Sequence, residues 1–327
     1  MNNLRTAIFN ISNYEALALQ VFLYQYENNR LYREYVDLLG VNPQFVKRLE
    51  AIPFLPIRFF KSHAVVCGDA LPTQWFESSG TTGTTNSRHY VADIQLYRES
   101  FQQGFQKFYG DPAGYAIIGL LPSYLERQHS SLVMMMDELI QQSEEPESGF
   151  YLYEHGKLKD TLQQLEARQK KTLLIGVTFA LLDFAEANPM PLKHTILMET
   201  GGMKGRREEM TRDQVHAVLT NAFQVPAIHS EYGMTELLSQ GYSDGRGIFK
   251  PADTMRILLR DDDDPMEVCT AGETPSRGII NVVDLANLDS CAFIATEDAG
   301  VLYPDGSFEV TGRVDHSDIR GCSLMVV

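Results

Sequence analysis

Apolar positions near the amino terminus recur at the spacing of an α-helix. Between residues 14 and 39 no proline intervenes, and large apolar side chains return every three or four positions, at Leu17, Val21, Tyr24, Leu31, Tyr35 and Leu38. This spacing predicts that residues from about 14 to 39 are helical. Asn42-Pro43 and the two prolines at positions 53 and 56 then break the pattern.

The middle of the chain alternates short apolar runs with amphipathic stretches. The runs predict buried strands at residues 115–121, 172–176, 194–198 and 225–229. The stretches predict helices at residues 132–142, 178–187 and about 204–222, the first of them capped by Ser130 or Ser131. Strands that alternate with helices form parallel β-α units, so we expect a mixed α/β fold.

The pattern changes after about residue 247. Short strand-like runs at residues 255–259, 278–283 and 307–310 are separated by turns such as Pro304-Asp305-Gly306. We therefore predict two parts: an α/β core with a helical amino-terminal segment at residues 1–246, and a β-rich subdomain with a tail at residues 247–327. The four aspartates at 261–264 are interpreted as a solvated loop, with a calcium site as the alternative.

Composition narrows the function. The formal net charge is -15, which argues against a duplex nucleic-acid binder and against docking to anionic lipid. Four scattered cysteines form no disulfide framework, which favours a reducing cytoplasm. No apolar run is long enough to span a bilayer, and residues 1–17 lack a signal-peptide run. We expect a cytoplasmic protein that binds anions through local basic residues and backbone amides.

The strongest local motif is Ser78-Ser79-Gly80-Thr81-Thr82-Gly83-Thr84-Thr85. Glycines let backbone N–H groups approach an anion closely, and the hydroxyls add side-chain donors. The motif predicts a phosphate-binding loop, and a flexible linker is the alternative. It is not a Walker A loop, because no Gly-Lys-Ser/Thr follows at the required offset.

A second motif, Ser230-Glu231-Tyr232-Gly233-Met234-Thr235-Glu236, follows the predicted strand at 225–229. The carboxyl end of a strand is the usual binding edge of an open α/β sheet. There the Thr235 hydroxyl can contact a phosphate and the Glu236 carboxylate can bind magnesium. The alternative is an ordinary strand-to-helix turn with a glutamate in the first helical turn.

A third group of residues comprises Asp298, the run Thr311-Gly312-Arg313-Val314-Asp315, and the ending Arg320-Gly321-Cys322. A carboxylate can accept hydrogen bonds from ribose hydroxyls, and a guanidinium can donate to ribose or phosphate. Taken alone, this group is better explained by a surface ion pair at a β-turn.

In this order over residues 78–315, the three motifs together resemble those of the adenylate-forming superfamily. Within it the chain is most similar to the acyl-protein synthetases of the LuxE type, which supply acyl groups to the fatty-acid reductase of bacterial luminescence. The segments LPSYLER (121–127) and ETGGMKG (199–205) and the ending Arg320-Gly321-Cys322 carry that likeness. The chain resembles phenylacetate–CoA ligases more distantly.

The resemblance implies the amino-terminal type of domain of these enzymes, with mixed α/β sheets, helices and a small β-rich subdomain. It implies activation of a carboxylic acid, with a fatty acid favoured, by joining it to AMP from ATP, with magnesium. It also assigns the site. Residues Ser79, Gly80, Thr81, Thr82, Gly83 and Thr84 hold the β- and γ-phosphates; Gly201 and Gly202 line the adenine and acyl pocket; Tyr232 stacks on adenine beside Gly233 and Met234; Thr235 contacts the α-phosphate; Glu236 binds magnesium; and Asp298 and Arg313 hold the ribose.

Two departures from the superfamily pattern affect the mechanism. The phosphate loop lacks the usual Pro-Lys, which leaves Arg88 as the nearest cation in the sequence. The chain ends shortly after Cys322, so we expect neither the usual mobile carboxy-terminal domain nor its adenylating lysine.

The resemblance also implies that Cys322 takes the acyl group as a thioester and passes it to a partner such as an acyl reductase or a carrier protein. A buried cysteine in a last strand is the alternative reading of this residue. Two other functions remain open: a coenzyme A or carrier-protein ligase, and a non-catalytic nucleotide-binding scaffold.

Overall fold

Parallel strands buried on both faces form the centre of the molecule. The computed structural model describes residues 2–78, 85–121, 129–201 and 210–314. Every residue of β4 (Ala116–Leu120) and β6 (Thr172–Val177) is buried, as expected for strands covered by helices on both faces. The parallel order runs β5 (Gly149–Phe150), β4, β6, β7 (Thr195–Thr200) and β8 (His229–Tyr232).

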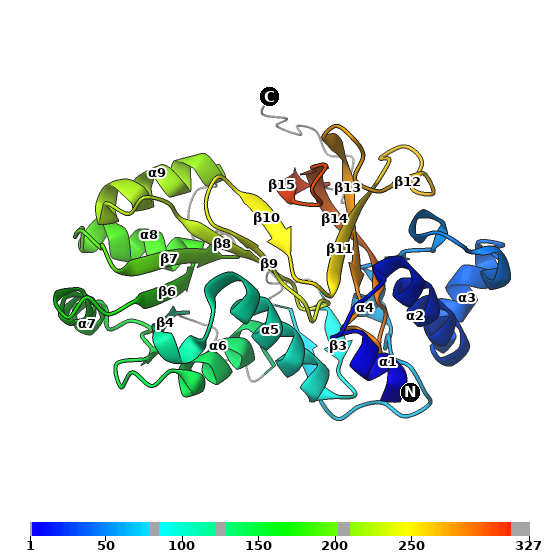
Figure 1. Ribbon diagram of the computed structural model, residues 1–327, viewed down its shortest axis with the longest axis horizontal. Coiled ribbons are helices and arrows are strands. Elements are labelled where there is room, and N and C mark those ends of the chain that lie inside the picture. Colours follow the sequence, from blue (N-terminus) through cyan, green and yellow to red (C-terminus); the bar gives the residue numbers. More distant parts are fainter. Residues whose placement is uncertain (1, 79–84, 122–128, 202–209, 315–327) are drawn as a thin grey trace.

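Helices cover both faces of these strands. α8 (Thr178–Ala187) and α9 (Arg212–Phe223) pack together on one face, and α5 (Ile94–Tyr109) and α6 (Ser131–Gln142) lie on the other (Figure 1). With α7 (His155–Ala167) between β5 and β6, the chain alternates strand and helix from β4 to β8. This alternation confirms the predicted β-α units.

The sheet becomes antiparallel beyond β8. It continues through β9 (Gly241–Ser243), β10 (Ile248–Pro251), β15 (Phe308–Arg313), β14 (Phe293–Leu302), β13 (Ser276–Asp284), β11 (Met255–Arg260) and β12 (Val268–Cys269). β1 (Leu55–Pro56) pairs in parallel with β14, and β2 (Trp75–Glu77) forms a separate hairpin with β3 (Arg88–Tyr90). Hydrogen bonds thus join the parallel and antiparallel strands without interruption. The division into parts at residue 246 stays a prediction.

The amino-terminal helices pack against the antiparallel strands. They are α1 (Asn2–Ala7), α2 (Tyr14–Asn28) and α3 (Arg30–Leu38), and the shorter turns are η1 (Pro43–Phe45), η2 (Leu49–Ala51), α4 (Phe59–Ser62) and η3 (Pro112–Gly114). Phe22 of α2 and Tyr32 of α3 both contact the ring of Phe293 on β14. None of the helices in the described segments combines the length and the apolar character needed to span a bilayer.

Most predicted elements are confirmed. Ser130 caps α6, with its hydroxyl oxygen accepting from the Val133 amide, and the strands β4, β6, β11 and β13 lie where the apolar runs predicted them. The run of aspartates at 261–264 is an exposed loop between β11 and β12.

Two predicted boundaries are wrong. The strand predicted at residues 225–229 lies at His229–Tyr232, so the second motif begins inside a strand rather than after one. The helix predicted from about residue 204 begins at Arg212, because Thr211 and Gln214 form a capping box there. Residues 204–209 of that prediction lie outside the described residues.

The helical prediction for residues 14–39 is confirmed, but Asn29 divides the segment into two helices, α2 and α3. The Asn29 side chain accepts a hydrogen bond from the Tyr32 amide and so caps α3. Its Nδ2 atom donates to the Ser290 carbonyl at 2.9 Å, and the residue is fully buried. The break therefore depends on a partner 261 positions away in the sequence.

Replacing Asn29 with alanine removes the cap of α3 and leaves the Ser290 carbonyl without this donor. We expect the unfolding free energy to fall by about 2–3 kcal/mol, since a cap is worth about 1 kcal/mol and a buried group left unpaired costs about 1–3 kcal/mol. Urea unfolding followed by circular dichroism measures the loss. Asn28→Ala is the control, because the exposed Asn28 side chain donates only to the Tyr24 carbonyl within its own helix. Equal losses in both variants would contradict this account.

Candidate functional site

The second and third sequence motifs meet at one buried carboxylate. Asp298 and Arg313 are paired across β14 and β15, with Arg313 Nε 3.4 Å from Asp298 Oδ1. The Tyr232 hydroxyl donates to Asp298 Oδ2 at 3.0 Å. Burial raises the pKa of Asp298, and Arg313 opposes that shift. The three residues assigned to the nucleoside are thus neighbours.

The strands that flank the first motif lie against the second. Ser78 and Ser87 close the neck of the β2–β3 hairpin: the Ser78 amide donates to the Ser87 carbonyl, and the Ser87 amide donates to Ser78 Oγ at 2.9 Å. The Ser87 hydroxyl lowers the pKa of the buried Glu236 carboxyl, which places the neck of the hairpin beside the second motif. The loop residues Ser79, Gly80, Thr81, Thr82, Gly83 and Thr84, together with Gly202 and Cys322, lie outside the described residues.

A turn held by distant side chains carries Thr235 and Glu236. His89 Nδ1 bonds to the Thr235 carbonyl at 2.9 Å, and Asn287 Nδ2 donates to the Glu236 carbonyl at 2.8 Å. Just beyond, the Asp284 carboxylate accepts from the amides of Leu238 and Ser239. The described chain has no helix between β8 and β9, so the helix start that was considered for this motif is wrong. Side chains from β3, from the end of β13 and from the turn after β13 fix the Glu236 turn instead.

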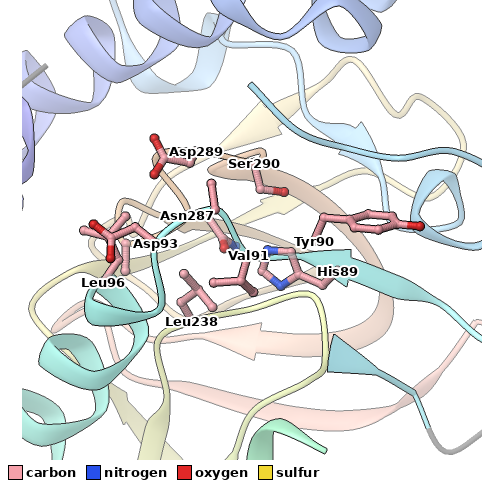
Figure 2. Close-up of a pocket in the computed structure, with 11 residues that line it drawn as sticks. His89, Tyr90, Val91, Asp93, Leu96, Leu238, Asn287, Asp289 and Ser290 are labelled. Atoms are coloured by element: carbon pink, nitrogen blue, oxygen red, sulfur yellow. The ribbon is translucent and has the colours of Figure 1, made fainter. Parts of the chain in front are cut away.

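His89 and Asn287 also line a small pocket behind this turn (Figure 2). Burial lowers the pKa of His89 to about 4, so its ring is neutral at pH 7. A neutral ring that donates from Nδ1 to a carbonyl leaves Nε2 as an acceptor. His89 Nε2 and Asn287 Oδ1 are buried and have no hydrogen-bond partner among the described residues. The pocket is far too small for a nucleotide. Its lining residues His89 and Asn287 hold the turn in place instead.

Glu236 is the less exposed of the two glutamates in the second motif, with only 6% of its surface accessible to solvent. Burial raises its pKa, while the Ser87 hydroxyl and the charges of Arg313 and Lys61 act in the opposite direction. The ion pairs found among the described residues include neither Glu236 nor Lys61. Arg88, the cation expected nearest the loop, lies 3.5 Å from Glu77 instead. The carboxylate is therefore buried without a direct positive partner in the described chain.

Tyr232 is buried, whereas Gly201 is exposed to solvent. The Tyr232 ring is 8% exposed and packs against Phe249 and Phe308, so its stacking on adenine stays a prediction. Gly201 follows β7 with a φ of 73°, a conformation that favours glycine. Its carbonyl accepts from the Thr178 hydroxyl at 3.1 Å.

Glu231 was not singled out by the sequence analysis, yet its environment is unusual. The Thr200 hydroxyl donates to its carboxylate at 2.5 Å. Burial raises the pKa of Glu231 to about 7, with Thr200 opposing the shift and Glu199 adding to it. A Cβ atom on Gly233 would lie 2.4 Å from Glu231 Oε1. Gly233 therefore makes room for this carboxylate beneath the turn.

The fold of this chain is found in several solved enzymes. A luciferase-like enzyme from the nonluminescent Zophobas morio mealworm matches with a TM-score of 0.51 and 18% identity, over 77% of this chain and 60% of that one. O-succinylbenzoate coenzyme A synthetase from Bacillus subtilis, in complex with AMP, matches with a TM-score of 0.50 and 17% identity, over 76% and 50%. No family model and no curated protein sequence matches the chain.

These likenesses establish the fold alone, because every identity is below a fifth. The chain has the mixed α/β fold of an adenylate-forming enzyme domain, which confirms the predicted fold class. It spans half to three-fifths of the length of these two structures.

The pKa of Glu231 generates a test of this environment. The folded protein binds the Glu231 proton more tightly than the unfolded chain, whose carboxyl has the ordinary pKa of 4.5. The unfolding free energy should therefore fall as pH rises from about 4.5 to 7, by up to about 3 kcal/mol from this group. Glu231→Gln removes the group, so the variant should gain stability relative to wild type over that range. Urea unfolding at pH 5, 6, 7 and 8 measures the difference.

The exposed Glu273 supplies the matched control, since Glu273→Gln should follow the wild-type pH dependence. A constant difference between Glu231→Gln and wild type from pH 5 to 8 would contradict the account.

Proposed function

We propose that this chain activates a carboxylic acid by joining it to AMP from ATP, with release of pyrophosphate. The observation that carries the proposal is the position of Glu236. This buried carboxylate lies at the neck of the glycine- and threonine-rich loop and within reach of the charges of Lys61 and Arg313. The fold, shared with the Bacillus subtilis synthetase whose complexes contain AMP or ATP and magnesium, supports it.

The chemistry requires the groups that this site contains. A carboxylate is a poor electrophile, because hydroxide is a poor leaving group. Attack of a carboxylate oxygen on the α-phosphorus forms an acyl-phosphate bond and breaks the bond to the bridging oxygen, which leaves with pyrophosphate. The protein has to align the two anions and offset charge on the phosphates. In our proposal Thr235 contacts the α-phosphate, and Ser79, Gly80, Thr81, Thr82, Gly83 and Thr84 hold the β- and γ-phosphates.

Magnesium is assigned to Glu236. The described residues contain no cluster of three or more His, Cys, Asp or Glu side chains that could hold an ion by themselves. A single carboxylate still fits magnesium, because this ion is commonly bound by one or two carboxylates together with substrate phosphates. Bound there, magnesium would offset charge on the phosphate oxygens.

The nucleoside is assigned to the opposite end of the second motif. Asp298 and Arg313 hold the ribose, and Tyr232 with Gly233, Met234, Gly201 and Gly202 surrounds the adenine. The Tyr232–Asp298 hydrogen bond supports this assignment, because it orients the carboxylate that is to accept from the ribose hydroxyls. Arg313, with 73% of its side chain exposed, is accessible to a ligand.

The acyl acceptor is assigned to Cys322. A thiolate attacks an acyl-adenylate readily, forms a thioester and releases AMP. We propose a fatty acid as the substrate and a protein acceptor, such as an acyl reductase or a carrier protein, for the thioester. The second candidate acceptor is coenzyme A, which is favoured by the name of the Bacillus subtilis synthetase of the same fold.

Pyrophosphate exchange tests the activation step. Wild-type protein with magnesium should incorporate labelled pyrophosphate into ATP only when a suitable acid from a panel of fatty and aromatic acids is present. Glu236→Gln should lower the exchange rate by about a hundredfold, since one electrostatic contact to a transition state is typically worth that much. Glu273→Gln, on an exposed loop, should leave the rate unchanged.

Folded protein that binds ATP but shows no exchange with any acid would make the chain a nucleotide-binding scaffold. The same incubation, followed by intact-mass analysis, tests the acceptor. Wild type should carry a thioester adduct that Cys322→Ser loses, while that variant keeps its exchange rate. Thioester formed on coenzyme A, with Cys322→Ser fully active, would assign the second acceptor.

A further inference from the structure

Lys61 occupies a position next to the candidate site that the sequence motifs do not indicate. It is the third residue of α4 (Phe59–Ser62), and its side chain is exposed. The segment that leads to it is fixed on the sheet, since β1 pairs with residues 294 and 295 of β14 and the Ile57 amide donates to the Ala295 carbonyl at 2.9 Å. β14 carries Asp298 three residues further on.

The residue before Lys61 connects α4 to the turn that carries Glu236. The buried Phe60 ring meets the His89 ring edge to face, with centroids 5.5 Å apart. His89 in turn holds the Thr235 carbonyl. Phe60, the residue before Lys61, is thus linked to the turn through one ring contact and one hydrogen bond. Phe60 is buried, whereas the side chain of the adjacent Lys61 is exposed.

The positive charge of Lys61 lowers the pKa of Glu236. No described residue forms an ion pair with Lys61. The other candidate cations differ. Arg88 pairs with Glu77, and Arg313 is beside Asp298 at the nucleoside end. In a chain with a net charge of -15, such a lysine is well suited to meet phosphates.

We propose that Lys61 binds the β- and γ-phosphates of ATP and stabilises the departing pyrophosphate. This inference rests on the proposed function. During attack the bond between the α-phosphorus and the bridging oxygen breaks, and its electron pair stays on the pyrophosphate. The ammonium group of Lys61 offsets that charge, and no proton has to move. Lys61 is then a catalytic residue that acts on the leaving group.

The test compares Lys61→Ala and Lys61→Arg with Lys47→Ala, a matched exposed lysine in the same amino-terminal region. Calorimetry measures the dissociation constants of ATP with magnesium and of AMP. Lys61→Ala should weaken ATP binding by about ten- to a hundredfold, as expected for a lost contact to a charged group, and should change AMP binding less than twofold. Lys61→Arg should restore ATP binding to within about threefold, and Lys47→Ala should match wild type.

The exchange assay then separates this proposal from the proposed function. If the wild type exchanges pyrophosphate, Lys61→Ala should lose exchange rate with little change in the KM for the acid. Equal ATP binding and exchange in Lys61→Ala and wild type overturn the role of Lys61 and leave the proposed function standing. A wild type without exchange, in which Lys61→Ala still weakens ATP binding selectively, overturns the function and leaves Lys61 as a phosphate-binding residue. A wild type that binds no ATP overturns both.

Discussion

The burial of the Glu236 carboxylate is the constraint on which the candidate site depends. Removing a charged carboxylate from water is costly unless hydrogen bonds or opposite charges compensate for it. In the described structure Glu236 has the Ser87 hydroxyl and the more distant charges of Arg313 and Lys61. An arrangement of this kind is stable with a cation bound, and it suits a site where magnesium arrives together with phosphate.

The turn that carries Glu236 is kept in place by groups that do not touch the proposed substrates. His89 belongs to β3, Asp284 ends β13 and Asn287 lies in the turn that follows it, and the three side chains hold the backbone from Thr235 to Ser239. Because these side chains are buried and their hydrogen bonds end on backbone atoms, the turn cannot shift without leaving polar groups unpaired. The position of Glu236 is thus set by the junction of the hairpin, the parallel strands and the antiparallel strands.

Much of the architecture was predictable from local pattern. The buried runs that became β4 and β6 and the Ser130 cap of α6 depend on neighbours in sequence, so periodicity and capping chemistry sufficed. The break at Asn29 was missed because its second partner, Ser290, is 261 positions away. The start of β8 was misplaced for a related reason: the apolar residues before it are buried without being paired in the sheet.

The site was predictable only in part, because some of its residues are brought together by contacts between distant parts of the chain. The resemblance to a known superfamily assigned Tyr232, Asp298 and Arg313 to the nucleoside, and the fold makes these three residues neighbours. Lys61, His89 and Asn287 belong to no local motif. The segment before Lys61 is placed by the pairing of β1 with β14, His89 by the pairing of β2 with β3, and Asn287 by its position after β13. Polar residues just after the apolar run of β13 were the one sequence signal that could have indicated Asp284 and Asn287.

The most direct measurement of the central claim is a crystal structure with magnesium and an ATP analogue that cannot release pyrophosphate. The account predicts a metal ion about 2.0–2.2 Å from a carboxylate oxygen of Glu236, with the triphosphate beside the neck of the β2–β3 hairpin. A nucleotide bound elsewhere, with no metal at the Glu236 carboxylate, would contradict it.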